Sequence, residues 1–173
     1  MSDGVADKLL TPERARQIVV DQTDSLRVER VAFTDAAFRF AAETVCANAA
    51  YPWFSFSAMD GYAVRASELE DASDGSRVSL PVESEIRAGS TKGKSLSEGS
   101  TIKIMTGAPL PDGADTVVMK EVVTGQNGHA VFHAPVEQWT AVNRAGEEIQ
   151  PGQVLVEAGT RLTPPSLGLL AAL

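Results

Sequence analysis

Apolar residues recur at helical spacing near the start and the end of the chain. Thr11-Pro12-Glu13 predicts a helix start, because Thr11 can cap, Pro12 suits the first helical position and Glu13 complements the positive helix end. We expect this helix to run to about Gln22. Thr163-Pro164-Pro165-Ser166 predicts another helix. Thr34-Asp35 predicts one between them, with a one-sided set formed by Ala37, Phe38, Ala41 and Val45.

Between about residues 65 and 140 the pattern changes to short β-like runs separated by turn residues. Residues 124–128 are typical of a hairpin loop, because their glycines can adopt positive φ. Residues 47–57 fit neither period and predict an ordered loop, whose aromatic side chains pack at a core edge or subunit contact in preference to stacking on a cofactor. The predicted strands cover residues 77–82, 101–105, 116–123, 129–132 and 154–156.

Composition limits the function classes. The 173 residues, 43% hydrophobic and 22% charged, are enough for one folded domain or two small ones. A net charge of -8 leaves no basic excess for nucleic acid. Cys46, the single cysteine, excludes an intrachain disulfide and suits a reducing compartment. With neither a secretory leader nor a run near the roughly 20 apolar residues of a membrane span, we predict a cytoplasmic protein without nucleic-acid or membrane partners.

Common catalytic signatures are missing from the sequence. It contains no G-x-x-x-x-G-K-[ST], no G-x-G-x-x-G between a strand and a helix, and no G-x-S-x-G, which argues against common nucleotide-binding folds and hydrolases. His129 and His133 lie four residues apart in a strand-like segment and can share one face. Because no further metal ligands are evident from their spacing, surface histidines are the favoured interpretation.

The first motif that can carry chemistry is S-A-M-D-G-Y-A-V-R, residues 57–65. Asp60-Gly61 permits a tight bend that presents a carboxylate while the backbone approaches a ligand closely. A simple turn without a catalytic acid is the alternative, and it is the more common use of this dipeptide.

The second motif is K-I-M-T-G-A-P-L-P-D-G-A-D-T-V-V, residues 103–118. A strand is expected to end at Thr106, after which Gly107 and two prolines stiffen the loop. Such a loop can hold a hydroxyl and free backbone N–H groups around an oxyanion. The alternative is a rigid hairpin connection with no ligand.

The two motifs, in this order and about forty residues apart, resemble the paired signature of the MoeA/gephyrin E-domain family. Weaker agreement at residues 146–149, 151–152 and 167–171 extends the resemblance over nearly the whole chain. The resemblance implies an α+β fold of the MoeA N-terminal type, in which a small mixed helical and strand subdomain, residues 1–46 plus 141–173, is intertwined with a β-rich subdomain, residues 47–140.

The resemblance also implies that the family's α/β domain and C-terminal β domain are absent. The apolar helix begun at Pro164 reaches Leu173 without a stop signal, which is a second reason to expect further sequence. Whether the chain is naturally short stays open at this point. A fragment of this kind is expected to be inactive alone.

Family members insert molybdenum from molybdate into the dithiolene of adenylylated molybdopterin, releasing AMP, with Mg²⁺ assisting. The resemblance therefore implies a molybdopterin molybdotransferase whose substrates are molybdate and adenylylated molybdopterin. It implies a homodimer, in which the β-rich subdomain lies across from the α/β domain of the other subunit, and further partners among molybdenum-cofactor synthesis proteins. Tungsten in place of molybdenum stays an alternative.

The motif positions nominate the site residues by resemblance. Asp60 is expected to act as a carboxylate in the metal or molybdate region and is a candidate Mg²⁺ ligand. Thr106 is expected to donate a hydrogen bond to substrate, and Glu148 is the third catalytic candidate. The remaining candidates for substrate binding are Ser57, Gly61, Gly107 and Arg144.

Two departures from the family's pattern weaken the transfer of site residues and keep an alternative function open. The usual Phe-Asp-Asn-Ser is replaced by Phe-Ser-Phe-Ser at residues 54–57, which removes a carboxylate and an amide and adds a ring. The later N-[IV]-R-x-x-G-E-D becomes A-V-N-R-A-G-E-E at residues 141–148, so the Arg is displaced by one position and the last Asp is Glu. A one-residue shift on a strand reverses the face of a side chain. The alternative is a dimerising or scaffold module that kept the fold without the chemistry.

Overall fold

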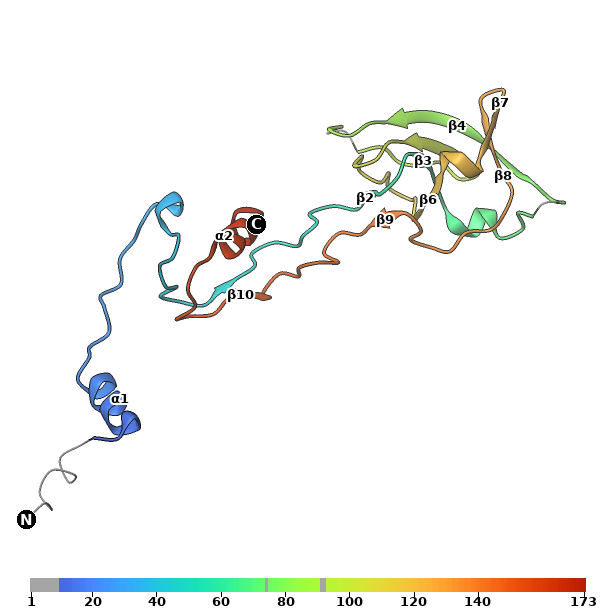
Figure 1. Cartoon of the computed structure of the whole chain (residues 1–173). Coiled ribbons are helices and arrows are strands. Elements are labelled where there is room, and N and C mark those ends of the chain that lie inside the picture. Colours follow the sequence, from blue (N-terminus) through green and yellow to red (C-terminus); the bar gives the residue numbers. More distant parts are fainter. Residues whose placement is uncertain (1–9, 74, 91–92) are drawn as a thin grey trace, which may run out of the picture.

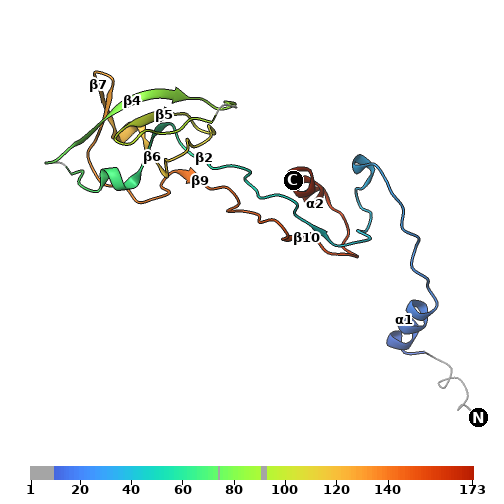
Figure 2. The same cartoon turned by 180° about the vertical axis from the view of Figure 1, so that it is seen from behind.

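The computed structural model describes residues 10–173 except 74 and 91–92. A β module, residues 56–143, lies at one end of an elongated molecule. The remaining residues, 10–55 and 144–173, form an arm that extends away from it, first as two segments running side by side and then as the N-terminal segment alone (Figure 1). The view from behind shows the same separation, with the N-terminal helix farthest from the module (Figure 2).

The β module is built on a six-stranded sheet in the order β6-β3-β5-β4-β8-β7. The long strand β4 pairs with β8 through its first half and with β5 through its second half. The β4–β5 pair is parallel, whereas the other neighbouring strands are antiparallel. The strands are β3 (Gly61–Val64), β4 (Val78–Ile86), β5 (Thr101–Ile104), β6 (Thr116–Met119), β7 (Thr124–Gln126) and β8 (His129–Phe132).

Two apolar clusters form the core of the module. Because successive side chains of a strand point to opposite faces, Ala63 and Val64 of β3 belong to different clusters. Ala63 packs with residues of β4, β5 and β6, including Ile86, Ile102, Ile104 and Val117. Val64 packs with Leu80, Phe132 and, from a 3-10 helix that covers this face, Leu69. The module is therefore stabilised from both sides of β3.

The predicted hairpin is confirmed, with a tighter loop than expected. Asn127 and Gly128, with φ of 49° and 78°, form the turn between β7 and β8. Asn-Gly is the favoured pair for such a two-residue turn because both positions need positive φ. Residues 124–126, expected in the loop, are strand β7.

A thin ribbon joins the module to the rest of the arm. Strand β2 (Phe56–Ser57) pairs with β9 (Val142–Asn143), and farther along β1 (Val45–Cys46) pairs with β10 (Val154–Val156), both antiparallel. A single bridge between Tyr51 and Ile149 continues the pairing between them. The ribbon thus holds together two segments about a hundred residues apart in sequence.

Two predicted helices are confirmed. Helix α1 (Pro12–Asp21) begins at Thr11, whose hydroxyl accepts a hydrogen bond from the Arg14 N–H at 3.2 Å, and none of the helix residues is buried. Helix α2 (Pro164–Ala171) begins at Thr163 with prolines in its first turn, where no N–H donor is needed.

The helix predicted from Thr34 is wrong. Residues 33–35 form only a 3-10 turn, after which the chain pairs with the segment before α2. The Phe38 N–H donates to the Leu162 carbonyl at 2.7 Å, and the Ala41 N–H donates to the Thr160 carbonyl at 2.9 Å. A φ of 66° at Phe38 is also incompatible with a helix. Backbone pairing with a distant segment therefore replaced the local helical pattern.

The strand predicted over residues 116–123 ends early, at Met119, and a 3-10 helix, Lys120–Val122, follows it. The subdomain boundaries predicted at residues 47 and 140 stay a prediction. Within residues 10–173, leaving aside 74 and 91–92, the structure has no helix with the length and apolar character needed to span a membrane.

Candidate functional site

The two sequence motifs meet at one edge of the β module. Asp60 comes directly before β3, and Thr106 comes shortly after β5. Because β3 is antiparallel to both of its neighbours, its first residue, Gly61, pairs with Ile104 of β5 and with Met119 of β6. The start of β3 therefore lies beside the ends of β5 and β6.

Gly61 allows the close approach that this arrangement requires. The residue is buried, and a Cβ atom added there would lie 2.1 Å from the Val118 carbonyl oxygen. No side chain can be accommodated at that separation without moving backbone. The substrate-binding role predicted for Gly61 stays a prediction, while the structure gives this glycine a packing role between β3 and β6.

Asp60, Thr106 and Lys120 form a hydrogen-bonded cluster. One carboxylate oxygen of Asp60, Oδ1, accepts from the Thr106 backbone N–H at 2.9 Å and from its hydroxyl at 2.8 Å. The other, Oδ2, accepts from the Lys120 ammonium group at 3.0 Å. Both donors of Thr106 are thus directed at Asp60, so the predicted donation from its hydroxyl to substrate would require the hydroxyl to turn away.

The cluster favours ionised Asp60. The Thr106 N–H makes the largest contribution to holding the pKa of Asp60 well below its usual range; the Lys120 and Thr106 side chains add to it, and desolvation opposes it. The Asp60 carboxylate in turn raises the pKa of Lys120. With 35% of the Asp60 side chain exposed, the ion pair lies at the surface of the module.

Ser57 and Gly107 hold the two loops together. The Gly107 N–H donates to the Ser57 carbonyl at 2.8 Å, and the Ser57 N–H donates to the Ala108 carbonyl at 3.0 Å. The buried Ser57 hydroxyl donates to the Met59 carbonyl at 2.5 Å. Gly107 has a φ of 76°, which suits glycine in the turn that leaves β5. Their predicted contacts with substrate stay predictions.

Arg144 and Glu148 are not brought to this cluster by the contacts that the structure shows for them. The Arg144 guanidinium lies 5.7 Å from the centre of the Trp139 ring and 3.6 Å from the Glu147 carboxylate. The exposed Glu148 donates its backbone N–H to the Tyr51 carbonyl at 3.1 Å. Their predicted roles stay predictions, since this chain alone does not place them beside Asp60.

Lys120 is the member of the cluster that sequence reasoning missed. It lies in V-V-M-K-E, residues 117–121, where the second signature of the family ends, but the resemblance gave it no role and no spacing rule within the sequence points from it to Asp60. The antiparallel register of β3 and β6 is the signal, because Gly61 opposite Met119 puts Asp60 opposite Lys120. That register was not predictable from the motifs.

The described residues do not fit a divalent cation at Asp60. Both carboxylate oxygens already accept hydrogen bonds, and one of the donors is itself a cation. Across residues 10–173, apart from 74 and 91–92, no three or more His, Cys, Asp or Glu side chains are grouped to hold a metal ion. His129 and His133 contact separate neighbours, the Asn127 carbonyl and the Thr124 hydroxyl.

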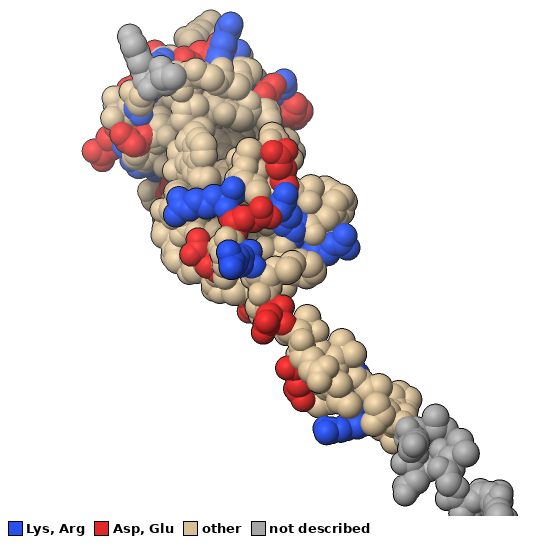
Figure 3. Space-filling model, turned by 90° about the vertical axis from the view of Figure 1, so that its left-hand side faces the viewer, with Lys and Arg blue, Asp and Glu red and all other residues tan. Residues whose placement is uncertain are grey.

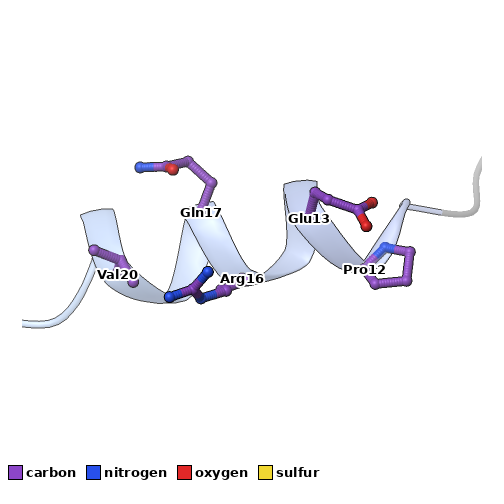
Figure 4. Close-up of a pocket in the computed structure, with 5 residues that line it drawn as sticks. All are labelled: Pro12, Glu13, Arg16, Gln17 and Val20. Atoms are coloured by element: carbon purple, nitrogen blue, oxygen red, sulfur yellow. The ribbon is translucent and has the colours of Figure 1, made fainter.

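Other surface features lie outside this cluster. A shallow pocket on α1 is lined only by residues of that helix, Pro12, Glu13, Arg16, Gln17 and Val20 (Figure 4). It lies at the far end of the molecule from the β module (Figure 1). In the face shown in Figure 3, positive and negative side chains are interspersed. The hydrogen-bonded cluster is therefore the stronger candidate for chemistry.

Comparison with known proteins identifies the family. The model of the MoeA N-terminal region (domain I and II) matches residues 10–173. The chain belongs to this family. Its relatives include the molybdopterin molybdenumtransferase of Haemophilus influenzae, 36% identical over 95% of this chain, and that of Bacillus subtilis, 39% identical over 83% of it. The chain spans 40% and 34% of the lengths of these two relatives.

Solved structures agree with the sequence comparison. Two structures of the molybdopterin biosynthesis MoeA protein from Pyrococcus horikoshii superpose with TM-scores of 0.86 and 0.88, at 34% and 30% identity. The matches cover 95% and 96% of this chain, and 42% and 44% of those chains. The predicted α+β fold of the MoeA N-terminal type is confirmed, and this MoeA N-terminal region is mostly β with two α-helices in its described part.

Proposed function

We propose that this chain acts as the N-terminal part of a molybdopterin molybdotransferase. In the proposed reaction, molybdenum from molybdate enters the dithiolene of adenylylated molybdopterin and AMP is released. The observation that carries the proposal is the Asp60–Thr106 pair, in which residues 46 positions apart, one from each motif, share two hydrogen bonds. Relatives named molybdopterin molybdenumtransferase support the assignment.

The geometry suggests what Asp60 does in this reaction. A carboxylate with a strongly lowered pKa is a weak base at neutral pH, so proton abstraction is not its best use. Its hydrogen bonds instead hold the Thr106 loop and the Lys120 ammonium group in place. Fixed donors and charges around oxyanions lower the cost of organising a site during reaction. Asp60 is accordingly assigned an organising role.

The remaining parts of the site belong outside the Asp60 cluster. The family's Mg²⁺ requires several oxygen ligands, which commonly include substrate phosphates. Because the described residues do not fit this ion at Asp60, we assign its binding to groups beyond this cluster. We propose that Glu148 and Arg144 contribute to the active site only when another part of the assembly contacts the arm.

A homodimer is the proposed assembly, and the arm supports it. Large apolar side chains that one copy leaves exposed include Leu10, Val19, Val20, Phe33, Phe40 and Trp53. An apolar groove at the C-terminal end of α2 is lined by Tyr51, Pro52, Trp53, Phe54, Phe56, Ala171 and Ala172. Apolar surface of this kind is typical of protein contacts. We further propose a cytoplasmic protein that works with other molybdenum-cofactor synthesis proteins.

The test is molybdate-dependent release of AMP from adenylylated molybdopterin by the complete gene product. Asp60→Ala is expected to lower kcat by about 100-fold or more, the scale seen when a fixed polar group of an active site is removed. Thr106→Ala is expected to have a smaller effect, because this change keeps the backbone N–H that donates to Asp60. Glu98→Ala, which removes the carboxylate of an exposed residue of the module outside the cluster, is the matched control and should retain activity. Undiminished activity in Asp60→Ala would refute the site assignment.

A scaffold module is the second candidate, and one observation favours it. The two departures from the family's pattern are neighbours, because Phe56 of β2 pairs with Asn143 of β9. Both residues of this cross-strand pair therefore differ from the family's pattern. Lack of AMP release at any molybdate concentration, together with an intact dimer in sedimentation, would favour the scaffold. Substituting tungstate for molybdate in the same assay tests the alternative metal.

A further inference from the structure

We propose that Lys120 is a positioning residue of this site and that its ammonium group occupies the cation position on Asp60. In this arrangement Asp60 anchors Lys120 and Thr106 and is not a ligand of a divalent metal ion. The part that Lys120 plays in catalysis rests on the proposed transferase function. The occupancy of Asp60 by Lys120 is a property of this chain and can be tested without the reaction.

The fold holds Lys120 against Asp60 through both backbone and side chain. The Lys120 N–H donates to the Asp60 carbonyl at 3.1 Å, which continues the β3–β6 ladder by one residue. The side chains of cross-strand neighbours lie on the same face of a sheet, so the ammonium group can reach Oδ2 of Asp60, at 3.0 Å. Gly61 fixes how closely the two strands approach.

The donors around the carboxylate leave one acceptor position, on Oδ2 beside the Lys120 ammonium group. Oδ1 accepts two hydrogen bonds from Thr106, and Oδ2 accepts one from Lys120. A metal ion at Oδ2 would either lie beside the ammonium group or displace it. Repulsion between the two positive charges opposes the first arrangement, and loss of the Lys120–Asp60 hydrogen bond opposes the second. Among the described residues, no group of three or more His, Cys, Asp or Glu side chains forms around Asp60 to offset that cost.

The cluster is accessible to a metal ion in solution, so the competition can be measured. Side-chain exposure is 51% for Lys120 and 35% for Asp60. The probe is Mn²⁺ alone, added to the full 173-residue chain labelled with ¹⁵N. A bound Mn²⁺ ion broadens the amide signals near it, and the Thr106 and Gly61 amides report on the carboxylate from two sides. The variants are Lys120→Met and Lys120→Arg.

Wild type is expected to show no selective broadening of the Thr106 and Gly61 amides. Lys120→Met frees Oδ2 and is expected to lower the Mn²⁺ dissociation constant at this position by about tenfold, because the competing positive charge is gone. Lys120→Arg keeps a cationic donor and should behave like wild type. Adding Asp60→Asn to Lys120→Met should abolish the gain. If Lys120→Arg behaves like wild type while Lys120→Met gains affinity for Mn²⁺, the change is caused by loss of the positive charge and not by loss of side-chain packing.

Selective broadening in wild type at the Mn²⁺ concentration that affects Lys120→Met would overturn the proposal, as would a folded Lys120→Met chain that gains no affinity. If Lys120→Met loses its dispersed amide spectrum, wild type is compared with Asp60→Asn instead, and selective broadening in wild type that Asp60→Asn removes would overturn the proposal. The assay contains neither molybdate nor molybdopterin. Failure here is therefore separate from failure of the proposed transferase function, which is measured by AMP release.

Discussion

The β module and the arm use strand pairing in different ways. In the module, six strands carry two apolar clusters, and Phe132 is only 1% exposed. In the arm, two paired segments run without a covering layer, and Phe40 is 67% exposed. Both regions satisfy backbone hydrogen bonds. The module buries most of its large apolar side chains, whereas in the arm Ile149 and Val156 are buried and many others stay exposed.

This difference explains where the candidate site lies. A two-stranded ribbon is marginally stable in water, whereas a larger sheet with buried faces can hold side chains in fixed positions. Asp60, Thr106 and Lys120 all lie at strand ends of the module's sheet. Arg144 and Glu148 lie in the arm, where we propose that another part of the assembly completes their surroundings. We therefore expect substitutions in the two regions to differ in kind.

Truncating the module core should have the largest effect. Phe132→Ala is expected to lower the free energy of unfolding by about 4 kcal/mol, through lost apolar burial and the cavity left behind. Phe40→Ala, the same change in the arm, is expected to stay within about 0.5 kcal/mol for the dissociated chain. Urea unfolding at a protein concentration where the chain is monomeric measures both.

Equal losses in the two variants would remove the distinction between module and arm. If Phe40→Ala strongly lowers the free energy of unfolding only at high protein concentration, Phe40 is instead buried against a second copy of the chain. Repeating the unfolding at two concentrations distinguishes these outcomes, because the stability of a dimer depends on concentration.

Adding one methyl group should have opposite effects in the two regions. Gly61→Ala forces Cβ against the Val118 carbonyl and is expected to cost about 3 kcal/mol, at the upper end of overpacking effects. Gly168→Ala lies inside α2, where an added Cβ meets no atom within 4 Å, and is expected to stabilise by up to about 1 kcal/mol. Thermal unfolding followed by circular dichroism compares the two. A neutral Gly61→Ala would contradict the close approach of β3 and β6.

The same contrast separates what sequence could predict from what it could not. Local signals worked where local chemistry decides: Thr11-Pro12 and Thr163-Pro164 begin helices, and Asn127-Gly128 makes a turn. The helix expected from Thr34 failed because its segment pairs with residues more than a hundred positions away. No periodicity within a segment reveals such a partner.

The candidate site shows the same limit. The motifs nominated Asp60 and Thr106, and the fold brings them into contact. Lys120 was missed because its link to Asp60 depends on the register between β3 and β6. The sequence showed the residues that carry charge, while the pairing of strands decided which of them meet. The motifs thus predicted two of the three members of the cluster, and the third depends on strand register.

A charge placed in the arm should weaken association. Val20→Asp puts a carboxylate on the exposed face of α1 and is expected to weaken the proposed homodimer by about tenfold, equivalent to about 1.4 kcal/mol. Val122→Asp introduces the same group at a comparably exposed residue of the module, 55% against 59%, and should leave the dimer unchanged. Sedimentation equilibrium measures both dissociation constants. A response confined to Val122→Asp would place the interface on the module.

The smallest expected effect is the acid dependence of the Asp60 contacts. The folded pKa of Asp60 is lowered, first by the Thr106 N–H and then by Lys120, so the ionised form stabilises the fold above the unfolded pKa of about 3.9. This contribution is lost as the pH falls toward the folded pKa. The stability difference between wild type and Asp60→Asn should accordingly be constant from about pH 7 to 5 and shrink below about pH 4.

Urea unfolding of both proteins across this range measures the difference, and other carboxylates cancel because they are common to the pair. In Lys120→Met the pKa of Asp60 should remain lowered, because the Thr106 N–H makes the largest contribution to lowering it. The stability difference caused by Asp60→Asn should then still change with pH in the Lys120→Met background, but over a narrower pH range. The amide signals of Gly61 and Thr106 should shift only at a pH below the usual range of an aspartate, because Asp60 stays ionised until then. A stability difference that does not change between pH 6 and pH 3 would mean that Asp60 is not held by these donors in solution.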